Sequence, residues 1–401
     1  MTGRVPKRPI PSRRHRSRSR TVTIREVAHQ AGVSVATVSR VLNEKGPVAT
    51  ATRERIREVA ERLRYVPHGA ARSLITNKTN AIGVLLPDIH GEFFSEIIRG
   101  IDLAARGRGY HLLVSSSHGH KGEIEAVLGV TRGRVDGLVV MSPDVDVDTL
   151  QANLPSTLPI VMLNCRSNGP TLDSITIDNY GGALGMVRHL AALGHRRIAL
   201  VRGPARNYDA RERLRGYRDG VRALALVQSK ELELEGDFTD GAGHRAGERA
   251  LALAPRPTAI FATNDSMAIG VLSALREAGV DVPGDIAVVG FDDIPISRYM
   301  SPPLTSVHVA IAELGTRAIE RLLHAIDTKN RHRRRHETLP TTLVVRSSCG
   351  AAGGGLTHTT NRRGKGHTRD PSGAIGRTAT GRAARAEGPP GNETIVPKGG
   401  R

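Results

Sequence analysis

The chain has 401 residues, of which 39% are hydrophobic, enough for two or three domains with buried cores. Its formal net charge is +19 at pH 7. No run of about eighteen apolar residues is present, which excludes a membrane-spanning helix. The two cysteines, Cys165 and Cys349, have no Cys-x-x-Cys spacing, so neither a metal site nor a disulfide framework is expected.

The positive charge is concentrated at the two ends of the chain. Residues 1–22 carry eight basic side chains and no acid, and residues 330–401 carry fourteen basic side chains and four acids. Residues 1–22 and 349–401 lack hydrophobic periodicity and are expected to be disordered tails. Basic tails are attracted to polyanions, with solvated tails that bind nothing as the alternative. No apolar segment follows Ser12-Arg13-Arg14, so no export signal is expected, and the predicted compartment is the cytoplasm, at the nucleoid.

Residues 23–43 have the pattern of two short helices joined by a turn. Thr23 and Glu26 have the spacing of a capping box, Gly32 can adopt a positive φ at the turn, and Ser34 is a good N-cap. The inward-facing residues are expected to be Ile24, Val27, Ala28, Ala31, Val38, Val41 and Leu42, followed in a third helix by Ile56, Val59, Ala60 and Leu63. The pattern predicts a helix-turn-helix whose second helix lies in the major groove of DNA.

The outward-facing residues of the second helix are the candidate DNA contacts. Arg40 is the best candidate for reading a base, because a guanidinium can donate two hydrogen bonds to guanine. Val35 and Ala36 can pack against a thymine methyl group. The polar candidates, suited to phosphate or mixed contacts, are Ser34, Thr37, Ser39 and Asn43, together with Thr23 at the start of the first helix. The alternative is a three-helix unit without a DNA role, in which Ser34 is only a helix cap.

The remainder of the chain, to residue 348, alternates short β-branched runs with amphipathic segments. The expected strands are 81–86, 111–115, 138–141, 159–163, 198–201, 259–262 and 286–290. The expected helices are 94–106, 122–132, 179–193, 211–225, 243–254 and 266–278. This alternation predicts an α/β fold with parallel sheets, and its two runs predict two similar lobes. Ligands of such sheets bind beyond the carboxyl ends of the strands, which would line a cleft between facing lobes.

Residues 27–43, VAHQAGVSVATVSRVLN, resemble the headpiece of the lactose-repressor/galactose-repressor (LacI/GalR) family. The resemblance continues through Tyr65-Val66-Pro67 and Ala71-Arg72-Ser73-Leu74 to about Ser348. It implies an all-α headpiece (23–64), a hinge helix and linker (65–78) and a two-lobed body (79–348) like periplasmic sugar-binding proteins. Chain crossovers near Ile177, Ser306 and Arg331 would assign 79–177 and 307–330 to the first lobe, and 178–306 and 331–348 to the second.

Residues 68–74 resemble the family's hinge helix. Leu74 falls at the position where an apolar side chain unstacks a base step in the minor groove, with a buried linker residue as the alternative. Gly69 weakens the helix, and a short isolated helix is marginal in water. The hinge helix is therefore expected to fold only on operator DNA, paired with its mate in a homodimer.

The resemblance also implies an effector site between the lobes. Its implied contacts are Asn164, Arg213, Phe238, Asn264 and Asp292, with Phe93 or Phe94 as a second apolar wall. The family more often has aspartate where this chain has Asn164. Such amide, carboxylate and guanidinium groups suit a polyhydroxylated ligand, because each hydroxyl both donates and accepts hydrogen bonds. A sugar is the first hypothesis, and a purine or a phosphorylated partner protein are alternatives.

Two of these residues have simpler interpretations as well. Asn264 has the character of a helix N-cap and Asp292 that of a turn residue. Their joint position at strand ends favours a binding site over either role alone.

The predicted function is a DNA-binding transcriptional regulator, in the first place a repressor, that binds a near-palindromic operator as a homodimer under the control of an effector. The alternatives are an architectural DNA binder driven by the basic tails, an effector-independent regulator, and a binding protein without a DNA role. No nucleophile elbow, P-loop, Gly-x-Gly-x-x-Gly or His-Glu-x-x-His motif is present, so neither an enzyme nor a cofactor is expected. No leucine heptads follow residue 348, which argues against a tetramerising coiled coil.

Overall fold

The computed structural model describes residues 22–43, 46–65, 78–117, 121–141, 150, 152–165, 172–328 and 332–351. The predicted hinge helix with Leu74, and nearly all of both predicted tails, lie outside the described residues. Among the helices of the described ranges, none is long and apolar enough to cross a membrane.

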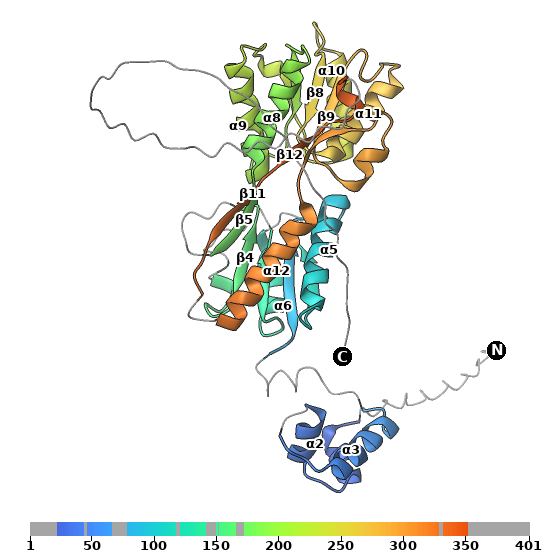
Figure 1. Ribbon diagram of the computed structural model, residues 1–401, viewed down its shortest axis with the longest axis vertical. Coiled ribbons are helices and arrows are strands. Elements are labelled where there is room, and N and C mark those ends of the chain that lie inside the picture. Colours follow the sequence, from blue (N-terminus) through green and yellow to red (C-terminus); the bar gives the residue numbers. More distant parts are fainter. Residues whose placement is uncertain are drawn as a thin grey trace, which may run out of the picture. The chain divides into compact units, whose positions relative to one another are not determined.

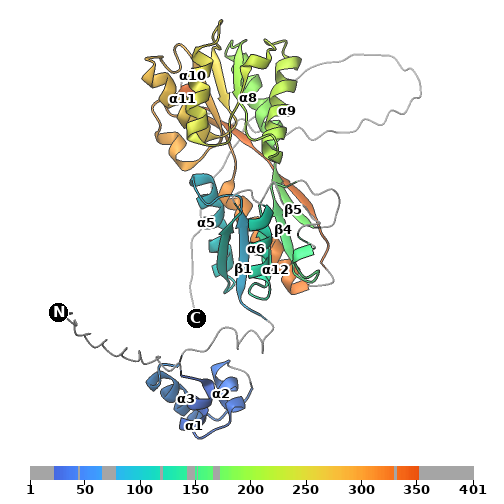
Figure 2. The ribbon, with the colours of Figure 1, turned by 180° about the vertical axis from the view of Figure 1, so that it is seen from behind.

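Three short helices form the headpiece, α1 (Ile24–Gln30), α2 (Val35–Leu42) and α3 (Thr50–Arg62), as Figure 2 shows. The predicted capping box is present, since the Thr23 N–H donates to the Glu26 carboxylate over 2.8 Å and the Glu26 N–H donates to Thr23 Oγ1. Gly32 has a φ of +62° at the turn. The buried core of the three helices consists of Val27, Ala28, Ala31, Val38, Val41, Ile56, Val59 and Ala60. The predicted helix-turn-helix is confirmed.

The body contains two six-stranded sheets, seen in Figure 1. The first has the order β11 (His336–Leu339), β5 (Asp173–Ile177), β4 (Ile160–Leu163), β3 (Gly137–Val140), β1 (Ala81–Leu86), β2 (His111–Ser116). The second has the order β12 (Thr342–Val344), β10 (Thr305–His308), β9 (Ala287–Asp292), β8 (Ala259–Ala262), β6 (Ile198–Val201), β7 (Glu233–Leu234). All pairings are parallel except that of β10 with β12.

Helices cover both faces of each sheet. The first lobe has α5 (Glu92–Arg106), α6 (Lys121–Thr131) and α12 (Ile311–Thr328). The second has α8 (Asn179–Ala192), α9 (Tyr208–Ala223), α10 (Asp240–Leu251) and α11 (Asp265–Glu277), with 3-10 turns at Lys230–Leu232, Pro295–Tyr299 and Ser347–Cys349. Alternate residues of one strand enter different cores, because strand side chains alternate between faces. In β1, for example, Val84 packs with α5 and α12, whereas Leu85 packs with α6.

Two of the predicted helices begin three residues too late. Helix α9 starts at Tyr208 because Asn207 Oδ1 accepts the Ala210 N–H over 3.0 Å, and α10 starts at Asp240 because Thr239 Oγ1 accepts the Ala242 N–H over 3.1 Å. Each cap precedes the apolar face, so a boundary drawn from hydrophobic periodicity alone falls inside the helix.

The crossovers between the sheets lie near two of the three predicted positions and differ from the third. The first follows β5 at Asp178, as predicted near Ile177. The second follows β10, so Ser306 lies inside the second lobe, and the third lies between Leu339 and Thr342 instead of near Arg331. The predicted boundary at 306–307 is therefore two residues too early, and the predicted boundary at 330–331 is wrong. The polar residues that open β11 give no hydrophobic strand signal, although its backbone pairs with β5.

Close packing of α5 against α12 generates a stability prediction. A Cβ added at Gly100 would lie 2.0 Å from the backbone oxygen of Ala312, so Gly100→Ala should lower the free energy of unfolding by about 1–3 kcal/mol. Gly185→Ala in α8 is the matched control, because nothing lies within 4 Å of its added Cβ, and removing a helix glycine should stabilise by about 0.5–1 kcal/mol. Urea unfolding measures both, and equal stability of the two variants would contradict the packing.

Candidate functional site

The outer face of α2 is the candidate DNA-reading surface. Val35 is 41% exposed, and Ala36 and Arg40 are also exposed. Arg40 forms no hydrogen bond or ion pair within the described residues, so its guanidinium is available to a partner. Ala36 and Arg40 lie on the side of α2 that faces away from the buried Val38 and Val41, and Val35 lies at the margin of that side, at the start of the helix. This arrangement matches the predicted surface.

The polar candidates of the headpiece all have local roles. Ser34 Oγ accepts the Thr37 N–H over 3.1 Å, and the two hydroxyl groups lie 2.9 Å apart. Asn43 Nδ2 donates to the Ser39 carbonyl over 2.8 Å. Thr23 belongs to the capping box of α1. Because exposed hydroxyl groups can bond a second partner, these roles shape the helices without preventing contacts with phosphate.

A buried arginine organises the candidate effector site. Arg213 on α9 is only 2% exposed. Its Nε donates to Asn179 Oδ1 over 2.8 Å, its Nη2 to Asp292 Oδ1 over 2.9 Å, and its Nη1 to the Thr263 carbonyl. The guanidinium carbon also lies 3.8 Å from the ring centroid of Phe291 and 5.9 Å from that of Phe238. The structure thus brings the predicted residues Arg213, Asp292 and Phe238 together.

Two carboxylates share this single guanidinium. Asp209, which sequence reasoning missed, accepts a hydrogen bond from Asn179 Nδ2 over 2.7 Å. Burial raises the pKa of Asp209 to about 6, opposed by the charge of Arg213 and by the bond from Asn179. Burial raises the pKa of Asp292 to about 6 in the same way, again opposed by Arg213. Asp209 lies in the first turn of α9, which follows β6, and Asn179 lies in the first turn of α8, which follows β5. Polar residues at helix starts that follow strands are the sequence signal that could have identified both.

Asn164 is buried but poorly satisfied. It follows β4, has a φ of +49° and is 5% exposed. Its amide lies close enough to Asp209 to lower the pKa of that carboxyl, yet neither of its polar atoms forms a hydrogen bond of ordinary geometry within the described residues. Buried polar groups are nearly always hydrogen-bonded, so the unsatisfied amide makes Asn164 a candidate partner for a ligand or water.

Positive φ angles recur among the predicted effector residues. Besides Asn164, Phe238 has a φ of +74° and Asp292 a φ of +103°. Such conformations cost on the order of 1–3 kcal/mol each in non-glycine residues and cluster at binding sites. Three strained positions in the predicted set therefore support a functional site.

Asn264 and Phe93 are the two remaining predicted effector residues, and their surroundings differ from those of Arg213, Asp292 and Phe238. Asn264 Oδ1 caps α11 by accepting the Met267 N–H over 3.0 Å, and its Nδ2 donates to the Phe238 carbonyl over 3.0 Å. Asn264 therefore caps a helix and also holds the backbone of Phe238. Phe93 lies on α5 with its ring 5.5 Å from that of Phe94, edge to face. We call Arg213, Asn179, Asp209, Phe238 and Asp292 the Arg213 group, and within the described residues no ring or cation–π contact joins Phe93 to it.

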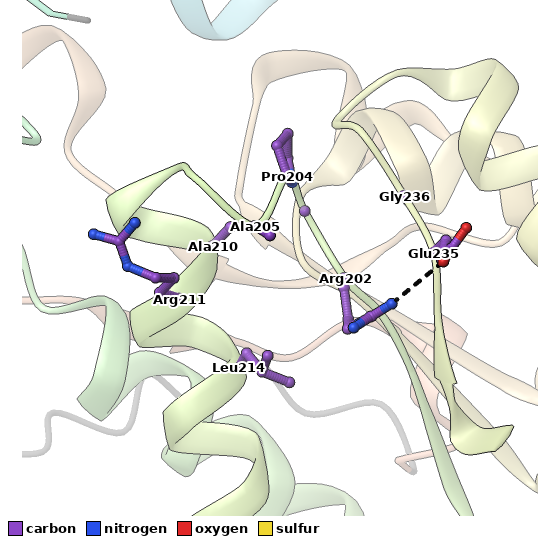
Figure 3. Close-up of a pocket in the computed structure, with 9 residues that line it drawn as sticks. Arg202, Pro204, Ala205, Ala210, Arg211, Leu214, Glu235 and Gly236 are labelled. Carbon is purple, nitrogen blue, oxygen red and sulfur yellow. Dashed lines mark ion pairs between the residues drawn. The ribbon is translucent and has the colours of Figure 1, made fainter. Parts of the chain in front are cut away.

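A cavity of about 260 Å³ lies beside this group in the second lobe, drawn in Figure 3. It is lined by residues that follow β6 and β7 and by α9, namely Arg202, Gly203, Pro204, Ala205, Ala210, Arg211, Leu214, Glu235 and Gly236. Ligand pockets usually exceed about 300 Å³, and none of the predicted effector residues lines this cavity. The Arg213 group is thus the better candidate. Within the described residues no cluster of His, Cys, Asp or Glu could hold a metal ion.

Comparisons with known proteins match both parts of the chain. Residues 23–68 match the family "Bacterial regulatory proteins, lacI family", and residues 187–349 match "Periplasmic binding protein-like domain". The HTH-type transcriptional repressor PurR of Photobacterium profundum is 36% identical over 81% of this chain and 98% of that protein.

Two solved structures are similar over most of the chain. The lac repressor dimer bound to operator and the anti-inducer ONPF shares 31% identity, covers 82% of this chain and 99% of its own, and has a TM-score of 0.73. The complex of the transcriptional regulator CelR with cellobiose shares 30% identity with the same coverage and has a TM-score of 0.62.

The shared guanidinium leads to a pH-dependent prediction. Arg213→Met should lower the free energy of unfolding by about 3–5 kcal/mol at pH 8, because it leaves Asp209 and Asp292 buried without a cation. Burial raises the folded-state pKa of each carboxyl to about 6 even beside Arg213, and removing this cation raises both pKa values further, so both carboxyls take up protons as the pH falls toward 5 and the loss should shrink.

Arg211→Met is the matched control for this substitution. Arg211 lies on the exposed side of α9 and donates only to the Arg206 carbonyl among the described residues, so its loss should change stability by about 0.5 kcal/mol or less. Denaturant titrations at pH 5 and pH 8 measure both variants. A loss in Arg213→Met that does not depend on pH would contradict the role of the two carboxylates.

Proposed function

The chain belongs to the lacI family of bacterial regulatory proteins, and from this premise we propose the residues and the ligand class with which it works. It is a DNA-binding transcriptional repressor that acts on an operator as a homodimer and responds to a small-molecule effector, and it is not an enzyme. We propose further that it is located at the nucleoid of the cytoplasm, where operator DNA lies.

In our proposal α2 reads the operator through Arg40. The observation that carries this assignment is a guanidinium that is exposed on the outer face of α2 and lacks a partner in the described chain. Val35 and Ala36 would pack against base edges beside it, and the hydroxyls of Ser34 and Thr37 would contact phosphates. Leu74, outside the described residues, is proposed as the minor-groove wedge of a hinge that folds on DNA.

Arg40→Ala should remove most of the sequence discrimination. Losing a bidentate contact to guanine costs about 1–3 kcal/mol, or roughly 5- to 150-fold in affinity for the preferred site. The measurement is in-vitro selection of bound genomic fragments, followed by titration of the recovered sequence with each variant. Arg55→Ala, which removes an exposed arginine from α3, is the control and should keep the same preferred sequence.

The outcome also separates the repressor from the alternative DNA binder. A short palindrome selected by the native protein and lost in Arg40→Ala supports the proposal. Fragments without a shared motif, unaffected by the substitution, would assign DNA binding to the basic tails instead.

For the effector we propose a sugar or another polyhydroxylated small molecule, bound against the Arg213 group. Asn164 offers both a donor and an acceptor, and Asp209 and Asp292 offer acceptor oxygens. The Phe238 ring adds an apolar face beside the guanidinium. A flat purine base would use fewer of these acceptors than a ring that carries several hydroxyl groups. The cellobiose complex of CelR is consistent with this choice.

Asn164→Leu should weaken sugar binding by about tenfold, because one or two hydrogen bonds of about 1 kcal/mol are lost. The measurement is the shift in melting temperature with cellobiose, ribose and the purine bases, then calorimetry with the best of these ligands. Gln228→Leu, which removes an exposed amide of the second lobe, should leave the affinity unchanged. Stabilisation by a purine base and by neither sugar would contradict the proposed ligand class.

A further inference from the structure

Several arginines gather at one end of the first lobe. Its sheet is parallel, so its strands begin at a common end, as the pairings of Ala81 with His111 and of His336 with Ser174 show. The segments that lead into these strands carry exposed arginines. We call this end of the sheet the basic edge, which comprises Arg108 before β2, Arg132 and Arg134 before β3, and Arg333, Arg334 and Arg335 before β11.

Most of these guanidinium groups lack partners. Arg132 donates to the Asn153 carbonyl. No hydrogen bond or ion pair of the described residues involves the side chains of Arg108, Arg134, Arg333 or Arg334. Their positive charge is therefore directed to solvent.

The acids near this end offset little of that charge. Asp136 accepts the N–H groups of Thr79 and Asn80 over 2.7 and 2.9 Å. Asp173 is paired with His332 and also accepts the Arg335 N–H over 3.0 Å. Tyr110, just before β2, has two acids near it among the described residues, Asp136 and Asp327. Of these, Asp327, near the end of α12, is exposed. Since residues 79–348 together carry no net charge, the six arginines of the basic edge are a local concentration of positive charge on a body that is neutral overall.

Helix ends explain only part of the basic edge. Arg108 follows α5, and Arg132 and Arg134 follow α6, where a cation is stabilised by the helix dipole. That effect fades within the last turn of a helix. Arg333 and Arg334 lie five and six residues beyond Thr328, the last residue of α12, and only Arg335 separates them from β11. The fold therefore supplies no reason for these two exposed arginines.

The same end receives the chain from the headpiece. Residue 78, just before β1, is joined to Tyr65 of the headpiece through residues 66–77. A segment of that length spans at most about 45 Å. Whatever DNA the headpiece binds is thus held within reach of the basic edge by a covalent tether.

We propose that the basic edge, through Arg333 and Arg334, binds DNA phosphates that flank the base pairs read by α2. The inference rests on the DNA-binding function stated above and adds a second, sequence-independent contact made by the body. Neutralised phosphates release counterions, so each such contact steepens the dependence of affinity on salt. The contact would also favour long DNA over a minimal operator.

The test compares two full-length variants that lose the same charge. Arg333→Gln/Arg334→Gln alters the basic edge. Arg249→Gln/Arg276→Gln removes two exposed arginines from α10 and α11 of the second lobe and is the control. The basic tails are present in both variants, so their contribution cancels in the comparison. Equal melting temperatures show that the surface changes leave the fold intact.

Two DNA probes distinguish flanking contacts from operator contacts. One is the minimal duplex recovered by selection, and the other carries the same site between unrelated flanks of about 15 base pairs, roughly one and a half helical turns. Affinities are measured between 50 and 200 mM salt. On the long duplex, Arg333→Gln/Arg334→Gln should reduce the slope of log affinity against log salt by about 0.9 per lost contact, roughly 2 per chain. On the minimal duplex it should match the native protein and the control.

Three results would overturn the inference. These are identical slopes for the two variants on the long duplex, an equal loss of slope on both duplexes, and no preference of the native protein for the long duplex. Failure of the proposed function is distinct from these results, because the native protein would then bind an unrelated duplex as tightly as the selected site.

Discussion

The buried guanidinium of Arg213 is the interaction on which the second lobe and its candidate site depend. It joins α9 to β9 through Asp292, to α8 through Asn179, and to the end of β8 through Thr263. A buried charge that loses its partner costs several kcal/mol, so these elements are ordered together. With two carboxylates beside one cation, the group carries a net negative charge when both carboxyls are ionised.

The site lies where the chain also connects the two sheets. Asp178, between β5 and α8, donates its N–H to the Leu339 carbonyl over 2.9 Å, which places the first crossover beside the third. The Ile296 N–H donates to Glu92 of α5 over 2.9 Å, a direct contact between the lobes. A ligand that changes these few connections changes the geometry of the first lobe, to which the headpiece is tethered. By linkage, operator DNA then alters ligand affinity by the same factor.

The charged residues are distributed unevenly along the protein, in a way that suits a DNA-binding repressor. The body, residues 79–348, is neutral overall, whereas positive charge is concentrated in the headpiece, at the basic edge and in the two end segments. Such a distribution attracts DNA to one end of the body and discourages it elsewhere. Sequence selection would rest on the outer face of α2, and much of the affinity on phosphate contacts.

The sequence by itself determined the parts that local rules govern. The capping box at Thr23, the turn at Gly32 and the apolar periodicity of α1 to α3 gave the headpiece correctly, because caps and faces depend on neighbours within one turn of helix. The alternation of strands and helices likewise gave two parallel-sheet lobes. The effector residues came from the resemblance to a family, and their binding role remains a prediction.

Only the tertiary structure decided which distant residues share a partner. Asp209 and Asn179 belong to the Arg213 group because α8 and α9 pack side by side, a contact that no local pattern encodes. The polar strand β11 joins the first sheet because pairing with β5 satisfies the hydrogen-bonding groups of its backbone, and this pairing does not require apolar side chains. The basic edge exists because a parallel sheet gathers the strand beginnings of three separate arginine-bearing segments at one end. Long-range pairing and burial, which depend on the whole chain, set these features.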